Sequence, residues 1–390
     1  NANDDDNNNI AENQKDVQVL AVVDELIEER KIFDAAKLLL SSSSNNVCLT
    51  LSKKKKYRDI VDGAELAKRV MEVHLSPPES TVSKEDEETE EGMIGEGRQR
   101  QQQHDDECWK KQGESHGNHD FIIYYKYVDK KLMLRIESPI EESLLIPLIS
   151  VLNETELYHT FMPRYTFPAR FGLEQTKKLQ EKGIGCQLLH VIFNMPFPVQ
   201  DRDFVQETFT VDDIDDNGTI IVLANTVVDV DVDERRNNDN DDDSNDDNND
   251  DDVVIIPPVG KNVVRMEATA GVTIRKCPSN HPALLNDNNN DDPSSTCSSR
   301  TNNLILITIT SQADPKLAFI PQSFINFATR TAIGGVWASQ LQVAESIRDG
   351  NRPLHQKAIN SNRDMYDWIE KRIEAIKEFH DVKKIQGKRN

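Results

Sequence analysis

The 390-residue sequence lacks the features that mark several classes of protein. Its five cysteines are scattered and form no C-x-x-C pair, so we expect reduced thiols in a cytosolic type of compartment. No apolar run approaches the roughly 20 residues that a membrane-spanning helix requires. The motifs G-x-S-x-G and H-E-x-x-H and the phosphate-binding P-loop are also absent, which argues against hydrolase, metalloprotease and nucleotide-binding chemistry.

Four potential metal ligands lie close together, at His104, Cys108, His116 and His119. Their spacing matches no common zinc finger, and the segment is typical of a linker. We therefore expect no metal ion. No cofactor is expected, and no motif in the sequence marks a catalytic residue.

Apolar residues are few, 37% of the total, and the net charge is −22. Both properties are concentrated in tracts at residues 4–6, 84–91, 237–252 and 287–292, which carry nearly all of the net negative charge. Such tracts cannot bury enough apolar surface to offset the entropy cost of ordering them. Because phosphate neutralisation requires a basic face, we also expect no nucleic-acid partner.

Helical periodicity marks the beginning of the chain. Residues 15–40 carry apolar side chains mostly at steps of three and four, with a bend near Lys31, and residues 57–75 form a further helix. We expect residues 1–78 to form a helical segment, either a small domain or a lid. A disordered linker rich in Glu and Gln is predicted at 79–107.

Period-two alternation and turn signals then predict about seven strands, at 121–127, 132–136, 186–193, 204–211, 219–230, 263–275 and 304–310. A short amphipathic helix is expected at 140–152, and residues 175–181 also fit a helix. Disordered insertions at about 233–256 and 279–302 fall between consecutive strands. They extend the connecting loops at little entropic cost, because loop-closure entropy grows only with the logarithm of length.

A long helix at about 319–347 follows the strands, and Pro321 suits its first turn. A more charged helix is predicted at 363–384, within a C-terminal segment 351–390 that ends in a basic tail. The predicted fold class is therefore α+β, with a curved antiparallel sheet that grips a long C-terminal helix and with N-terminal helices.

Residues 195–205 read Met-Pro-Phe-Pro-Val-Gln-Asp-Arg-Asp-Phe-Val and join two predicted strands. Two prolines remove backbone donors, which predicts a rigid hairpin corner with a polar turn at 201–203. This arrangement resembles the signature of START (StAR-related lipid-transfer) domains. Trp109, the run Val263-Val264-Arg265, and residues 311–315 followed by Ile320-Pro321 resemble further marks of that family in the same order.

The resemblance implies a helix-grip fold around a lipid-sized tunnel and a START-like lipid-binding domain at residues 108–350. It leaves the ligand open, because Thr208 stands where some sterol-binding members carry an arginine. One side of the long helix carries small residues at Ala328, Thr331, Gly335 and Ala338. These either let helix and sheet approach closely, as dense native packing favours, or leave room for a ligand, as the resemblance implies.

Inward positions of the strands and of the long helix are the expected lipid contacts. They are Leu189, Val191, Phe193, Val205, Phe209, Met266, Ala268, Ile307, Phe324, Phe327, Ala328 and Thr331, with the two helix phenylalanines as gates. The polar candidates are Glu207 and Arg265. They either form a buried charge pair that orients a headgroup or, as the cost of burying charge favours, lie in a salt bridge on the outer face.

The leading hypothesis is a non-enzymatic protein that binds a sterol, a phospholipid or a similar lipid and transfers it. We expect it in the cytoplasm and peripherally at membranes, where Lys53–Lys56 and the basic tail would make transient contact with anionic lipid. One alternative is a regulatory or scaffold protein with a filled core, whose protein partners the sequence does not indicate. Another is a helix-grip enzyme that acts on an apolar substrate. His190 is its best catalytic candidate, although the alternation points this residue away from Leu189 and Val191.

Overall fold

The computed structural model describes residues 2–41, 54–76, 78, 108–116, 119–128, 131–162, 164–165, 170–227, 256–284, 304–314, 316 and 321–387. The predicted linker at 79–107 and most of both predicted insertions lie outside these residues. The second insertion does not begin at residue 279 as predicted. His281 and Ala283 are buried in the short helix η3 (Pro282–Leu284) and the turn before it.

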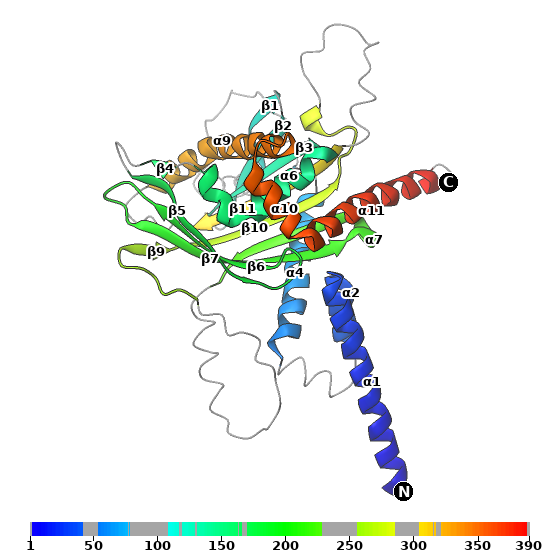
Figure 1. Cartoon of the computed structure of the whole chain (residues 1–390). Helices are drawn as coiled ribbons and strands as arrows, with labels where there is room; N and C mark the ends of the chain where they lie inside the picture. Colours follow the sequence, from blue (N-terminus) through cyan, green and yellow to red (C-terminus); the bar gives the residue numbers. More distant parts are fainter. Residues whose placement is uncertain are drawn as a thin grey trace, which may run out of the picture.

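One large sheet forms the centre of the molecule (Figure 1). Its strands are ordered β1-β2-β3-β11-β10-β8-β7-β6-β5-β4. All these neighbours are antiparallel, whereas β9 pairs parallel with β7 beyond the point where β8 ends. The bounds are β1 Lys110–His116, β2 Asp120–Val128, β3 Lys131–Glu141, β4 Arg164–Tyr165, β5 Phe171–Glu181, β6 Gln187–Asn194, β7 Asp201–Asp213, β8 Thr219–Thr226, β9 Val263–Arg265, β10 Glu267–Lys276 and β11 Leu304–Asp314.

Helices cover both faces of this sheet (Figure 1). The face that we call inner is covered by α6 (Glu142–Asn153), α9 (Gln322–Arg348), α10 (Pro353–Ser361) and α11 (Arg363–Gly387). The face that we call outer is covered by α2 (Ile32–Ser41) and α4 (Lys55–Leu75), and α1 (Ala2–Glu28) packs against α2 and projects away from the sheet. This is the predicted α+β helix-grip arrangement, and the fold class is confirmed.

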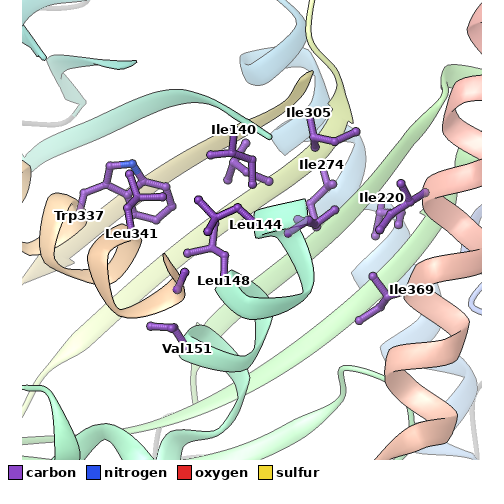
Figure 2. Close-up of a cluster of buried hydrophobic side chains, with 14 of the residues drawn as sticks. Ile140, Leu144, Leu148, Val151, Ile220, Ile274, Ile305, Trp337, Leu341 and Ile369 are labelled. Carbon is purple, nitrogen blue, oxygen red and sulfur yellow. The ribbon is translucent and has the colours of Figure 1, made fainter. Parts of the chain in front are cut away.

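The inner face holds the larger apolar core, shown in Figure 2. Leu144 and Leu148 of α6 point into the space between the sheet and α9. Trp337 and Leu341 of α9 enter this core from one side, and Ile369 of α11 enters it from the other. Burial of these side chains holds the three helices on the sheet.

The outer face has a separate core in which the N-terminal helices meet the sheet. Val23, Leu39 and Ile60 belong to one buried cluster with Val211 and Ile221 of β7 and β8. The predicted bend between the first two helices lies where expected, at Arg30 and Lys31, and Arg30 has a positive φ of 66°. The helices therefore share a core with the sheet on the face turned away from α9.

Two local predictions were wrong. Residues 175–181 continue strand β5 instead of forming a helix, because they pair with β6 across two irregularities in register. The predicted polar turn at 201–203 is the start of strand β7, where Arg202 and Asp203 are buried. Strands β1 and β4 and helix α10 were not predicted, since each is short or polar.

Candidate functional site

Side-chain size falls steadily along the inner face of the sheet. Cross-strand register places the residues of β11, β10 and β8 in rows. Towards the start of β10, these rows are Ile307–Ile274–Ile220, Ile309–Val272–Val222, Ser311–Ala270–Ala224 and finally Ala313–Ala268. We call the first row the packed end, and the last two rows the small-residue end.

Burial follows the same gradient. Ile307, Ile274 and Ile220 of the packed end are 2%, 6% and 2% exposed and lie in the core with α6 and α11. At the small-residue end, Ala270 and Ala224 are only half-buried, although alanine has the smallest side chain that can be covered. The sheet is therefore filled at one end and thinly covered by described side chains at the other.

Strands β6 and β7 extend the small-residue end sideways with larger apolar groups. Val191 lies opposite Phe204 in the register, and Leu189 lies opposite Gln206. The rings of Phe193 and Phe204 are stacked with centroids 6.1 Å apart, and both side chains are half-buried. The larger apolar side chains of β6 and β7 therefore lie beside the alanines of the small-residue end.

The structure separates the predicted lipid contacts into two groups. Leu189, Val191, Phe193, Ala268 and Ile307 lie on the inner face, and Ile307 belongs to the packed end. The inward placement of Val205 and Phe209 was wrong: Val205 pairs with His190, and Phe209 packs against the N-terminal helices. A hairpin shift of one residue reverses the face of every side chain, and the sequence does not indicate which register is used. Met266 lies between β9 and β10, and its backbone N–H donates to the carbonyl oxygen of Asp203.

Helix α9 lies across the inner face, and its side chains are described mainly in its C-terminal half. Trp337 and Leu341 are buried there. Of the predicted small-residue side, Gly335 is exposed, whereas Ala338 is half-buried against the inner core. Gly334 makes the close approach instead, because a Cβ atom there would lie 3.1 Å from Cδ1 of Ile123. The side chains of Phe324, Phe327, Ala328 and Thr331 lie outside the description.

The two polar candidates lie on the outer face and do not pair with each other. Glu207 forms an exposed ion pair with Lys182 at 3.4 Å. Arg265 donates to Asp203 at 2.8 Å and to the carbonyl oxygen of Pro257. The first alternative, a buried pair that orients a headgroup, is therefore wrong, because both residues face away from the inner face. The second alternative, ion pairing on the outer face, fits both residues, although each pairs with a different partner.

Asp203 also lies within hydrogen-bonding distance of His190, with 3.0 Å between its Oδ2 and Nε2 of the histidine. Burial tends to raise the pKa of Asp203, but the hydrogen bonds from Arg265 and His190 outweigh this and lower it. His190 points away from Leu189 and Val191, as the alternation predicts. The enzymatic alternative loses its best candidate, since His190 is held in a buried polar cluster with Asp203 and Arg265 on the outer face.

A second polar cluster on the outer face was not predicted. The fully buried ring of His74 lies 3.0 Å from Oγ1 of Thr273 and 2.8 Å from Oγ1 of Thr310. Arg135, which is 1% exposed, donates to Glu137 and to carbonyl oxygens at the end of α4, at Val73, His74 and Ser76. In the sequence, the only signal was the placement of Arg135 and Glu137 between apolar residues of one strand.

Two further properties of the described residues concern metal ions and membranes. There, no three His, Cys, Asp or Glu side chains are placed to share a metal ion. His119, one of the four potential ligands, lies 3.4 Å from a carboxylate oxygen of Glu345. None of the helices in this part of the chain combines the length and the apolar character needed to cross a bilayer.

Comparison with known proteins found similarity only in three dimensions. No protein-family model matches the chain, and no curated protein matches its sequence. The structure is similar to human STARD10, with 12% identity and a TM-score of 0.41 over 70% of this chain and 87% of that one. Human StAR-related lipid transfer protein 5 gives 12% identity and a TM-score of 0.41 over 73% and 98% of the two chains. A STAR-related lipid transfer protein from Xanthomonas axonopodis gives 15% identity and a TM-score of 0.37 over 62% of this chain and 98% of that one.

Proposed function

We propose that this chain binds a lipid between the small-residue end of the inner face and the N-terminal half of α9. The observation that carries the proposal is the fall in side-chain size from the isoleucine row to the alanine rows, together with the half-burial of Ala224 and Ala270. A helix packed directly on a sheet is normally met by large side chains, because protein interiors are close-packed. In this proposal, the alanines leave space for an apolar ligand.

The remaining contacts follow from this placement. Leu189, Val191, Phe193 and Ala268 would contact the lipid from the sheet, and Phe324, Phe327, Ala328 and Thr331 would contact it from α9. Burial of apolar area stabilises by roughly 25 cal/mol per Å², so an acyl chain or a sterol could be held without a strong polar contact. The polar clusters of the outer face have structural roles in this proposal, and the chain is not an enzyme. Its lipid transfer would take place in the cytoplasm and at membrane surfaces.

The test is recovery of a bound lipid and its displacement by a larger side chain. Native mass spectrometry and solvent extraction of the purified full chain should recover a lipid, and the protein should take up a fluorescent lipid analogue from a cyclodextrin carrier. Ala270→Trp should reduce this uptake at least about tenfold, because the indole would occupy the proposed space. Ala332→Trp makes the same change on the exposed side of α9 and should leave uptake unchanged.

Two outcomes would contradict the proposal. No recovered lipid and no uptake by the wild-type chain would favour the alternative of a filled core with a regulatory or scaffold role. Equal uptake by wild type and Ala270→Trp would place the lipid elsewhere. Unfolding midpoints of both variants should be measured, so that loss of binding is separated from loss of structure.

A further inference from the structure

One arginine of α9 lies on the side of that helix that faces the sheet. Arg330 comes four residues before Gly334 and seven before Trp337, a spacing that places the three residues on one stripe of an α-helix. Gly334 lies close to Ile123 of β2, and Trp337 is buried in the inner core. Arg330 therefore brings a positive charge to a stripe whose next members pack against apolar groups.

The guanidinium group of Arg330 lies over an aromatic ring of the sheet. Its central carbon is 4.3 Å from the centre of the Tyr125 ring, which is a cation–π contact. The side chain is half-buried, and in the part of the chain that the structure describes its buried Nε atom has no hydrogen-bond acceptor and its charge has no carboxylate partner. A buried donor without an acceptor is costly, so the position favours a ligand that supplies one.

Tyr125 belongs to the same row of the sheet as alanines of the small-residue end. Cross-strand register places Tyr125 of β2 opposite Leu134 of β3, and Leu134 opposite Ser311 of β11. Ser311 in turn lies opposite Ala270 of β10. Adjacent strands are about 4.8 Å apart, so three steps place Tyr125 about 14 Å from Ala270. Arg330 therefore lies at the β2 end of the row on which the proposed lipid would bind.

The two ends of this row differ in polarity. At the β2 end, Tyr125 and Ser311 are half-buried, and within the described residues their hydroxyl groups form no hydrogen bond. Beyond the alanines, at the other end, lie the stacked rings of Phe193 and Phe204. A polar side with a positive charge and an apolar side suit a ligand that has one charged end and one apolar end.

We infer that Arg330 binds the charged end of the ligand, and that the ligand is a lipid with a single negative charge on a carboxylate or a phosphodiester. This inference rests on the proposed function. A guanidinium group can donate two parallel hydrogen bonds to either anion. One arginine neutralises one negative charge, whereas a doubly charged headgroup would keep an unpaired charge in a poorly hydrated site. With its charged end at Arg330, the lipid extends its apolar chain over the alanines towards β6 and β7.

The experiment measures the uptake of three radiolabelled lipids by the full chain from a cyclodextrin carrier. They are oleate, its neutral counterpart oleyl alcohol, and lysophosphatidylglycerol, which carries a phosphodiester. The wild type should bind at least one of the two anionic lipids at least about tenfold more tightly than oleyl alcohol. Arg330→Gln should remove this preference by weakening the anionic lipid alone, because the amide keeps hydrogen-bonding groups but has no charge. Its unchanged uptake of oleyl alcohol would show that the variant is folded.

Arg348→Gln is the matched control, because it removes the same charge from the same helix. Arg348 pairs with Glu141 at 3.5 Å and with Asp349 at 3.3 Å, at the C-terminal end of α9. Its loss should leave the uptake of all three lipids unchanged. Arg330→Lys keeps the charge but loses the planar fork of donors, so its preference for the anionic lipid should lie between those of the wild type and Arg330→Gln.

Two results would overturn the inference. One is equal binding of the three lipids by the wild type, and the other is a preference for an anionic lipid that Arg330→Gln leaves intact. If Ala270→Trp still blocks the uptake of oleyl alcohol in either case, the proposed function stands without this inference. If the wild type takes up none of the three lipids, both are contradicted. A preference that depends on Arg330 for oleate alone, or for lysophosphatidylglycerol alone, supports the inference and identifies the charged group.

Discussion

The two faces of the sheet are built in different ways. The outer face shares an apolar core with the N-terminal helices and is also fastened to them by buried polar bonds, in which Arg135 caps the end of α4 and His74 lies between two threonines. Across β8, β10 and β11 the inner face is mainly apolar and changes from tightly packed isoleucines to half-buried alanines. Polar bonds require fixed geometry, whereas apolar contact tolerates rearrangement. We therefore expect the outer face to be the more rigid of the two.

Removal of Arg135 should have the largest effect on stability, because Arg135 belongs to the polar cluster that distinguishes the outer face. Arg135→Met should lower the free energy of unfolding by about 3–5 kcal/mol, because it leaves Glu137 buried with one fewer partner and removes the donors to three carbonyl oxygens of α4. Denaturant unfolding followed by circular dichroism measures the change. Arg164→Met is the control, since this side chain is 56% exposed and its ion pair should contribute less than about 1 kcal/mol. Equal effects of the two variants would mean that the outer face is not held by this cluster.

Two neighbouring residues of β10 compare the faces directly. A Cβ atom on Gly271 would lie 2.6 Å from Cγ1 of Val70 in α4, and valine has little rotamer freedom to move aside. Gly271→Ala should therefore cost about 1–3 kcal/mol of unfolding free energy through overpacking. Ala270→Val adds larger bulk one residue away, on the inner face, and should cost less than about 1 kcal/mol. A larger cost at Ala270 would indicate that the small-residue end is already filled.

The smallest expected effect concerns pH and sharpens the role of His74. Burial, followed by the nearby charges of Arg135 and Arg275, lowers the pKa of His74 to about 3. As the pH decreases, the unfolded chain therefore binds a proton at His74 before the folded chain does. The contribution of His74 to the free energy of unfolding is complete above the ordinary histidine pKa and falls as the pH decreases below it. Between about pH 7.5 and about pH 5.5, this contribution should amount to about 1.4 kcal/mol.

His74→Gln is the comparison for that measurement. The amide can still bond to Thr273 and Thr310 but cannot titrate in this range. Chemical unfolding at several pH values should give a flatter dependence for the variant than for the wild type. Parallel curves would exclude His74 as the source of the pH dependence.

The order and class of the elements could be predicted from the sequence, because most of them have clear periodicity. The helices at 15–40 and 57–75, the hairpin of β2 and β3, and the long C-terminal helix are confirmed. Residues 175–181 of strand β5 were predicted as a helix, since their alternation is weakened by bulges and by the lysines 177 and 178. Periodicity reports local burial and does not indicate which element covers a face.

The candidate site was predictable only in part, for the same reason. Alternation placed Leu189, Val191 and Ala268 on one face correctly. Which residues of β7 share that face depends on the register between β6 and β7, which the corner at 195–200 sets. The decrease in side-chain size across β11, β10 and β8 appears only when distant strands are aligned. His74 and Arg135 meet for the same reason, since a helix and a strand far apart in the chain must first be packed together.

The pairing of β3 with β11 has a consequence for synthesis of the chain. Glu141 is bonded in register to Leu304, and Met133 to Gln312. Strands β1 to β3 are therefore synthesised long before β11. Until β11 is made, β3 is an unpaired edge strand with which other chains can pair. Messages truncated upstream of Leu304 should yield aggregates, and nascent chains of that length should depend on chaperones.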